Sequence, residues 1–265
     1  MEAAQAGTLT PRVSTSVLVE ACVDAIDAAI EAERGGASRI ELCGELLQGG
    51  VTPSAGLIDI ACERLNIPVF VLVRPRTGDF LYTADEVNVM LRDIAMLKPL
   101  GIGGVVIGAL TTDGDVDVAT TRTLIDAARP MQVTFHRAFD FARDQDAALA
   151  ALLDAGVDRV LTSGGAATAL EGAPTLARLQ QRAGDRLTVL AGGKITASNV
   201  AELVRVSGVR EVHVRAALPL PSAMRFRRNI ASLSRVAPPG EYERSVTRAD
   251  EMARVVARLR EVTTL

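Results

Sequence analysis

Two Glu-x-Cys motifs stand out among the residues whose types and spacing could carry chemistry. Glu20 and Cys22 end one apolar run, and Glu41 and Cys43 end the next. Side chains two positions apart on a strand share a face, and neighbouring strands lie about 4.8 Å apart. The paired thiols could therefore hold one soft cation such as Cu(I). They could also be buried without a ligand or serve redox chemistry, and Cys62 is expected in the core.

Two arginines follow the third apolar run, in the segment 74–80 (RPRTGDF). Guanidinium groups bind carboxylates and phosphates with two parallel hydrogen bonds, so Arg74 and Arg76 are candidate contacts to an anion. An alternative interpretation pairs Arg74 with Glu20 or Glu41 inside the site. The two interpretations are compatible, and both remain open at this point.

His136 ends the fifth apolar run, in the segment 134–140 (TFHRAFD), and is one of two histidines in the chain. Imidazole titrates near neutral pH, so His136 is the candidate acid–base catalyst if the protein is an enzyme, with Glu20 or Glu41 assisting. The alternative is a structural histidine. Arg137 and Asp140 follow directly and are candidate contacts to an anionic substrate.

Glycine pairs follow the sixth and seventh apolar runs. Backbone N–H groups in such loops can bind an anion, so Gly164, Gly192 and Gly193 are further candidate anion contacts, although tight turns use glycine pairs as well. The chain has two lysines, Lys98 and Lys194. Neither is expected to be buried at a strand end, which argues against a Schiff-base mechanism.

Short β-branched runs alternate with amphipathic stretches from residue 17 onward, and this alternation positions the motifs. The predicted strands are 17–22, 39–42, 68–73, 104–107, 132–135, 159–161, 187–190 and 211–214. The predicted helices are 24–34, 54–65, 84–97, 118–128, 147–155, 167–182, 196–206 and 247–262. Eight such units predict an α/β fold, a single (β/α)₈ TIM barrel with its chemistry after the strand ends. An open doubly wound sheet is the alternative, and His213, on the last strand, is expected to be structural.

Length and composition agree with one such domain. The chain has 265 residues, 48% of them hydrophobic, and a net charge of −3. The sequence has no stripe of basic residues of the kind that binds nucleic acid. It also has no apolar run of the length expected for a membrane span or a secretory signal. A cytoplasmic protein with reduced thiols is expected. Residues 1–14 are expected to be a disordered tail and 15–265 the barrel, with an irregular segment at about 217–246.

The sequence resembles the CutC family. The segments that carry the resemblance are 19–22, 39–43, 48–54, 74–80, 134–140 and 161–165. The resemblance implies a (β/α)₈ barrel, a cytoplasmic location, a homo-oligomer (dimer or tetramer) and an association with copper, whose proposed ligands correspond to Cys22 and Cys43. One departure lies after His213, where Arg215 and small apolar residues replace the serine-rich turn expected from the family. Arg215 would then substitute for those hydroxyls at an anion site.

Two functions remain open from the sequence. The first is a Cu(I)-binding protein of copper homeostasis that uses Cys22 and Cys43, since two thiols do not complete a four-ligand zinc site. The second is an uncharacterised barrel enzyme for a small phosphorylated or carboxylated substrate, with His136 as acid–base and Arg74 and Arg76 on the anion. The expected partners are therefore a copper ion or a small anionic ligand, with no nucleic acid and no membrane.

Overall fold

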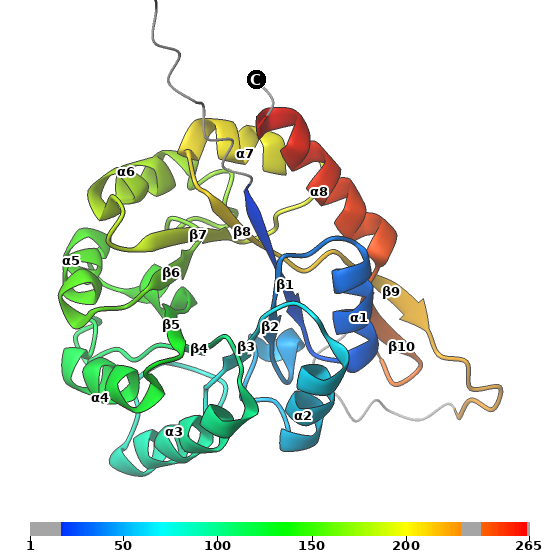
Figure 1. Cartoon of the computed structure of the whole chain (residues 1–265), viewed down its shortest axis with the longest axis horizontal. Helices are drawn as coiled ribbons and strands as arrows, with labels where there is room; N and C mark the ends of the chain where they lie inside the picture. The colour runs from blue at the N-terminus through cyan, green and yellow to red at the C-terminus, as the bar shows by residue number, and fades with distance from the viewer. Residues whose placement is uncertain (1–16, 229–239, 264–265) are drawn as a thin grey trace, which may run out of the picture.

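Eight parallel strands close into a barrel that eight α-helices surround, within residues 17–228 and 240–263, which the computed structural model describes (Figure 1). The strands are β1 Leu18–Val23, β2 Arg39–Leu42, β3 Val69–Leu72, β4 Gly104–Ile107, β5 Gln132–Phe135, β6 Arg159–Thr162, β7 Thr188–Gly192 and β8 Glu211–Val214. The helices are α1 Ile26–Arg34, α2 Ala55–Arg64, α3 Ala84–Leu97, α4 Val118–Ala128, α5 Gln145–Ala155, α6 Ala173–Ala183, α7 Val200–Ser207 and α8 Ala249–Thr263. The predicted (β/α)₈ architecture is confirmed.

Local sequence signals explain where the helices begin and end. The side chain of Thr83 accepts the backbone N–H of Glu86, and the Glu86 carboxylate accepts the N–H of Thr83, which starts α3 with a capping box. Gly156 and Gly208 follow α5 and α7 in the left-handed conformation that ends many helices. Strands β6 and β8 therefore begin shortly after well-defined helix ends, and the loops at the opposite end of the barrel are free to carry the site.

Helix α6 begins later than the predicted 167–182, at Ala173. Pro174 lacks a backbone N–H and is tolerated only in the first turn, so a helix cannot run from residue 167 through it. The residues before α6 instead form a loop that docks on the end of β7, where the N–H of Ala169 donates to the carbonyl of Gly193 at 2.9 Å. Pro174 thus indicated the true start of α6, whereas the apolar periodicity of the sequence predicted an earlier one.

The predicted irregular segment at about 217–246 contains regular structure at both of its ends. Strands β9 (Ala217–Pro221) and β10 (Glu243–Thr247) pair antiparallel outside the barrel, next to α1 (Figure 1). The middle of that segment and the predicted tail at 1–14 lie outside the described residues. Among the described helices, none combines the length and the apolar character needed to cross a membrane.

A layer of buried ion pairs fills the barrel interior below the strand ends. Arg39 donates to Glu20 at 2.5 Å and to Glu211 at 2.7 Å, and Arg159 donates to Glu211 at 2.6 Å. The ring of Phe70 lies against both guanidinium groups, 4.7 Å from Arg39 and 5.4 Å from Arg159. This layer has two arginines and two glutamates, so its charges balance, and it closes the barrel beneath the site.

Three shorter helical segments complete the loops around the barrel. They are 3-10 helices, η1 (Leu46–Gln48), η2 (Lys98–Leu100) and η3 (Arg137–Phe141). Both η1 and η3 follow strands at the carboxyl end of the barrel, after β2 and β5. The backbone of η3 therefore sets the directions of the Arg137 and Asp140 side chains.

Candidate functional site

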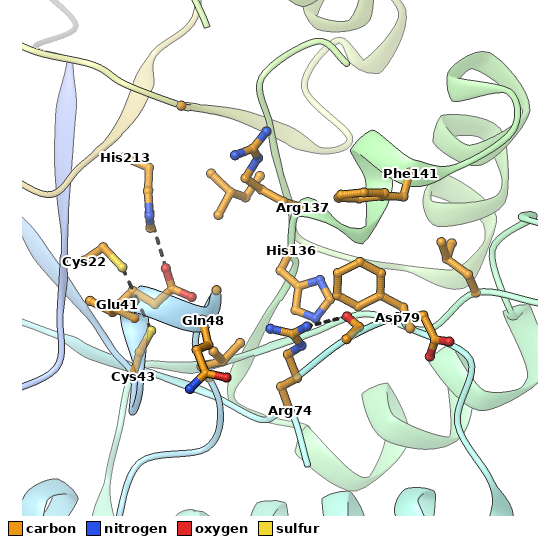
Figure 2. A pocket seen from close by; sticks show the side chains of 18 of the residues that line it. Cys22, Glu41, Cys43, Gln48, Arg74, Asp79, His136, Arg137, Phe141 and His213 are labelled. Carbon is orange, nitrogen blue, oxygen red and sulfur yellow. Dashed lines mark hydrogen bonds and ion pairs between the residues drawn. The ribbon is translucent and has the colours of Figure 1, made fainter. Parts of the chain in front are cut away.

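A cavity of about 1080 Å³ lies at the carboxyl ends of the barrel strands. Figure 2 shows Cys22 and Cys43 on one side of it and Arg74, His136 and Phe141 on the other. The predicted site residues that line it are Cys22, Glu41, Cys43, Arg74, His136, Arg137 and Gly193. The other predicted residues, outside the lining, are Glu20, Arg76, Asp140, Gly164 and Gly192. The sequence motifs thus converge on one site, although not every member faces it.

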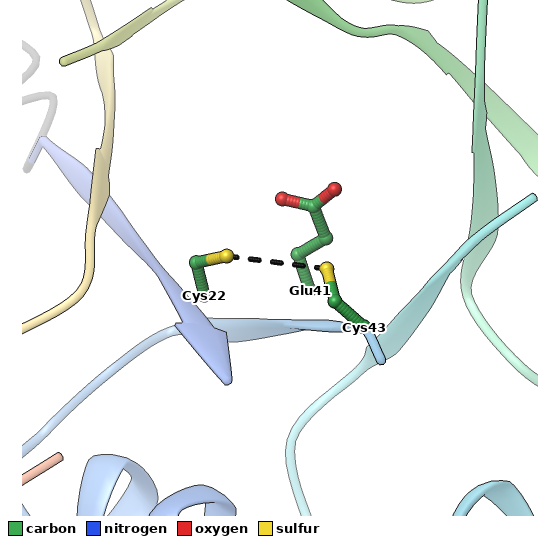
Figure 3. A group of neighbouring side chains, drawn as sticks. All are labelled: Cys22, Glu41 and Cys43. Atoms are coloured by element: carbon green, nitrogen blue, oxygen red, sulfur yellow. Dashed lines mark hydrogen bonds between the residues drawn. The ribbon is translucent and has the colours of Figure 1, made fainter. Parts of the chain in front are cut away.

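The two thiols face each other, with the Sγ atoms of Cys22 and Cys43 4.0 Å apart (Figure 3). Their strands are staggered, because Cys22 pairs in register with Glu41 and Glu20 pairs with Arg39. Cys43 therefore lies two residues further along the chain than the partner of Cys22. The N–H of Cys43 donates to the carbonyl of Val23 at 2.9 Å. The predicted pairing of the motifs brings the thiols together, but the motifs are offset along the strands.

A carboxylate and imidazole cluster lies directly below the thiols. His213 Nδ1 is 2.8 Å from Glu20 and 3.3 Å from Glu41. Burial opposes ionisation of Glu20, but the hydrogen bond from His213 and the charge of Arg39 outweigh it and lower its pKa to about 2. Burial also acts against the charged form of His213, yet the negative charges of Cys22 and Glu41 raise its pKa well above the usual range. His213 is therefore an imidazolium at neutral pH.

Cys22 is the more acidic of the two thiols. The hydrogen bond from Cys43 and the charge of His213 lower the pKa of Cys22 to about 5, against the opposing effect of burial. The same hydrogen bond, together with burial, raises the pKa of Cys43 well above its usual range. Burial, reinforced by the Cys22 charge, also raises the pKa of Glu41 well above its usual range. At neutral pH the pair is a thiolate at Cys22 that accepts from a thiol at Cys43.

His136 is a buried, neutral imidazole. Its Nδ1 accepts the N–H of Ala138 at 3.1 Å, so the ring proton is on Nε2. Burial and the charge of Arg74 lower its pKa to about 3. The ring fits because residue 108 is glycine, where a Cβ atom would lie 2.3 Å from the imidazole. This geometry favours a neutral hydrogen-bond donor over the acid–base role that the sequence suggested.

The chain has two histidines, so an NMR titration separates the two environments directly. We expect His136 to stay neutral in its Nε2–H form down to about pH 4, because its pKa is about 3. His213 is expected to stay protonated through neutral pH, because its pKa is raised. The measurement is the ¹⁵N chemical shift of both rings against pH, with His213→Gln assigning the signals. Two titrations near pH 6.5 would contradict both assignments.

Arg74 and Arg76 have different environments. Arg74 is buried and donates to the carbonyls of Gly50 and Gly78 at 2.8 and 2.6 Å. Glu20 pairs with Arg39 instead, so the proposed pairing of Arg74 with Glu20 is not found. Arg76 lies outside the cavity lining and donates to Glu86 at 2.5 Å. Of the two arginines, Arg74 is the one placed to meet a ligand.

The glycine loop after β6 already holds a carboxylate of the chain itself. Asp140 accepts the backbone N–H groups of Ser163 and Gly165 at 3.1 Å and the hydroxyl of Thr162 at 2.5 Å. Arg137 donates to the same carboxylate at 2.7 Å. Asp140 therefore accepts the N–H groups on either side of Gly164 and pairs with Arg137, which the sequence analysis assigned to an external anion. Gly164 is also engaged, because its N–H donates to Thr162.

His213 is the site residue that the sequence analysis underestimated. Three helix-to-strand joints share one pattern, and aligning them places Glu41, Leu161 and His213 at equivalent positions of β2, β6 and β8. All three line the cavity, as expected for one layer of side chains from alternate strands of a barrel. The same alignment places Arg39, Arg159 and Glu211 in the ion-pair layer below. The repeated joint in the sequence could therefore have predicted which residues share the cavity lining and which share the ion-pair layer.

The fold and the site define a (β/α)₈ barrel with paired thiols at the ends of its first two strands. The model of the CutC family matches residues 17–218, and the chain belongs to the CutC family. A CutC family protein of Chromobacterium violaceum is 47% identical over 89% of this chain and 95% of its own length. The human copper homeostasis protein cutC homolog is 46% identical over 87% of this chain and 84% of its own length.

Solved structures agree with this assignment. The structure of CutC from Streptococcus agalactiae superposes with a TM-score of 0.71 at 31% identity, covering 74% of this chain and 97% of that one. Phosphoribosylanthranilate isomerase from Thermotoga maritima superposes with a TM-score of 0.56 at 11% identity, over 92% of this chain and 99% of that one. The second likeness concerns the barrel fold alone.

Proposed function

We propose that this protein binds one Cu(I) ion through Cys22 and Cys43 and acts in copper homeostasis. The observation that carries the proposal is the 4.0 Å separation of the two Sγ atoms. Metal–thiolate bonds are about 2.3 Å long for zinc, so two thiolates that share one ion lie no more than about 4.6 Å apart. The names of the mouse and human relatives, copper homeostasis protein cutC homologs, point in the same direction.

The chemistry of the donors supports Cu(I) over harder ions. Thiolates prefer soft cations, and Cys22 has a lowered pKa that keeps one thiolate available. Glu41 completes a group with both thiols within 4.8 Å, but a carboxylate is a hard ligand that a soft ion such as Cu(I) does not prefer. Two sulfur ligands suit an ion of low coordination number, whereas structural zinc takes four ligands.

The test is a Cu(I) titration of reduced protein against a competing chelator. We expect one ion per chain in the wild type and at least a hundredfold loss of affinity in Cys22→Ser/Cys43→Ser, because hydroxyls are poor ligands for a soft ion. Cys62→Ser is the matched control, since Cys62 lies on α2 outside the cavity lining. Equal affinity of the wild type and the double variant would refute the proposal.

A further inference from the structure

Arg74 is a buried cation without a carboxylate partner among the described residues. Its side chain is 5% exposed and lines the cavity. Its NH groups donate to two neutral backbone carbonyls, those of Gly50 and Gly78, and no ion pair within 4 Å involves it in the described part of the chain. Neutral acceptors leave the charge itself uncompensated, and buried charges are normally paired.

His136 supplies a second donor in the same wall. Its Nε2 is buried and has no hydrogen-bond partner in the described structure, while its Nδ1 is engaged by the N–H of Ala138. An unmet buried donor is unfavourable, because it has lost its hydrogen bond to water without gaining another. The ring of Phe80 lies against both groups, 5.0 Å from the imidazole centroid and 5.0 Å from the Arg74 guanidinium. Arg74 and His136 thus form one patch of the cavity wall, with Phe80 packed against both.

The rest of the cavity lining adds positive charge and apolar surface. The other lining side chains that carry or can carry positive charge are Arg137, Lys194, His213 and Arg215. The carboxylates that line it are Glu41 and Asp79, and Asp79 is bonded to Arg76. The apolar part of the wall comes from Leu72, Phe80, Leu110, Phe141, Leu161 and Ile195. Arg137, His213 and Arg215 are paired with Asp140, Glu20 and Asp24. Within the described lining, Arg74 and Lys194 are therefore the cations without an ion-pair partner.

We propose that this cavity binds a small organic anion, a carboxylate or a phosphate with an apolar body. Arg74 supplies the compensating charge, and the Nε2–H of His136 donates to an oxygen of the anion. The apolar wall, Phe80 included, holds the body of the ligand. The anion site lies across the cavity from the thiols (Figure 2), so it does not depend on bound copper.

Calorimetric titration of reduced, metal-free protein tests the proposal with four probes. Phenyl phosphate and benzoate are expected to bind, inorganic phosphate more weakly, and phenol at least tenfold more weakly than phenyl phosphate. Arg74→Met is expected to weaken phenyl phosphate binding at least tenfold, whereas Arg254→Met, which removes an exposed arginine of α8 outside the cavity lining, leaves it unchanged. Failure of both anions to bind, or equal losses in the two variants, would overturn the proposal.

Arg74 also supports two loop carbonyls, so Arg74→Met could lose its fold. Arg74→Lys, which keeps the charge, and an NMR measurement on the wild type cover that case. Phenyl phosphate is expected to shift the Nε2 resonance of His136, and an unmoved resonance at saturation would overturn the proposal. Cys22→Ser/Cys43→Ser is expected to bind phenyl phosphate like the wild type, so loss of copper binding and loss of anion binding are separate results.

Discussion

Replacing Arg39 with methionine is expected to lower the free energy of unfolding by about 3–5 kcal/mol, the cost of removing one partner from a buried ion pair. Arg39 donates to both Glu20 and Glu211, and the side chains of Arg39 and Glu20 are at most 5% exposed. Methionine keeps much of the volume but leaves two buried carboxylates with less positive charge. Urea denaturation followed by circular dichroism measures the change.

The matched control is Arg143→Met, which removes an arginine from an exposed pair with Asp115. Those side chains are 65% and 44% exposed, and exposed pairs contribute roughly 0–1 kcal/mol. We therefore expect the control to unfold within about 1 kcal/mol of the wild type. A similar small change in Arg39→Met would mean that the ion-pair layer is not required for stability.

The thiol of Cys22 is expected to ionise with a midpoint near pH 5, because its pKa is lowered to about 5. The thiolate is present above that pH and is lost as the pH falls through it. An ordinary cysteine with a pKa of about 8.5 is about 3% ionised at pH 7, so Cys22 holds about thirty times more thiolate. The pH profile of alkylation, followed for each cysteine by peptide mass spectrometry, measures the midpoint.

Cys62 serves as the reference thiol within the same molecule. Burial and the charge of Asp59 raise its pKa, so its alkylation should rise only well above neutral pH. His213→Gln removes the imidazolium next to Cys22 and is expected to move the Cys22 midpoint upward, while the Cys62 midpoint stays in place. Coincident profiles for Cys22 and Cys62 in the wild type would contradict the thiolate assignment.

The fold was accessible from the sequence because each barrel unit carries its own signals. Alternating apolar runs and helix-ending glycines such as Gly156 are local features, and they suffice to count the units. Strand stagger is not local. It arises when the sheet closes on itself, so the sequence placed Cys22 and Cys43 at one level, whereas Cys22 pairs with Glu41.

The sequence indicated which residues lie near the candidate site better than it indicated what each of them does there. Residue type and position after a strand singled out Arg74 and His136, which line the cavity, and Asp140, which lies outside the lining. Their roles depend on the turns that follow: η3 brings Asp140 to the loop after β6 and places the N–H of Ala138 on the imidazole of His136. Such intramolecular hydrogen bonds decide whether a group is available to a ligand, and the spacing of residues does not encode them.

The ion-pair layer beneath the thiols also makes the cavity a blind-ended compartment. Whatever reaches Cys22 must enter past the exposed rim, where Phe141 is 69% exposed, and leave by the same route. An ion at the thiols and an anion across the cavity at Arg74 would then share this one entrance. The rates at which both enter and leave would depend on access through the rim as well as on the strength of their own contacts.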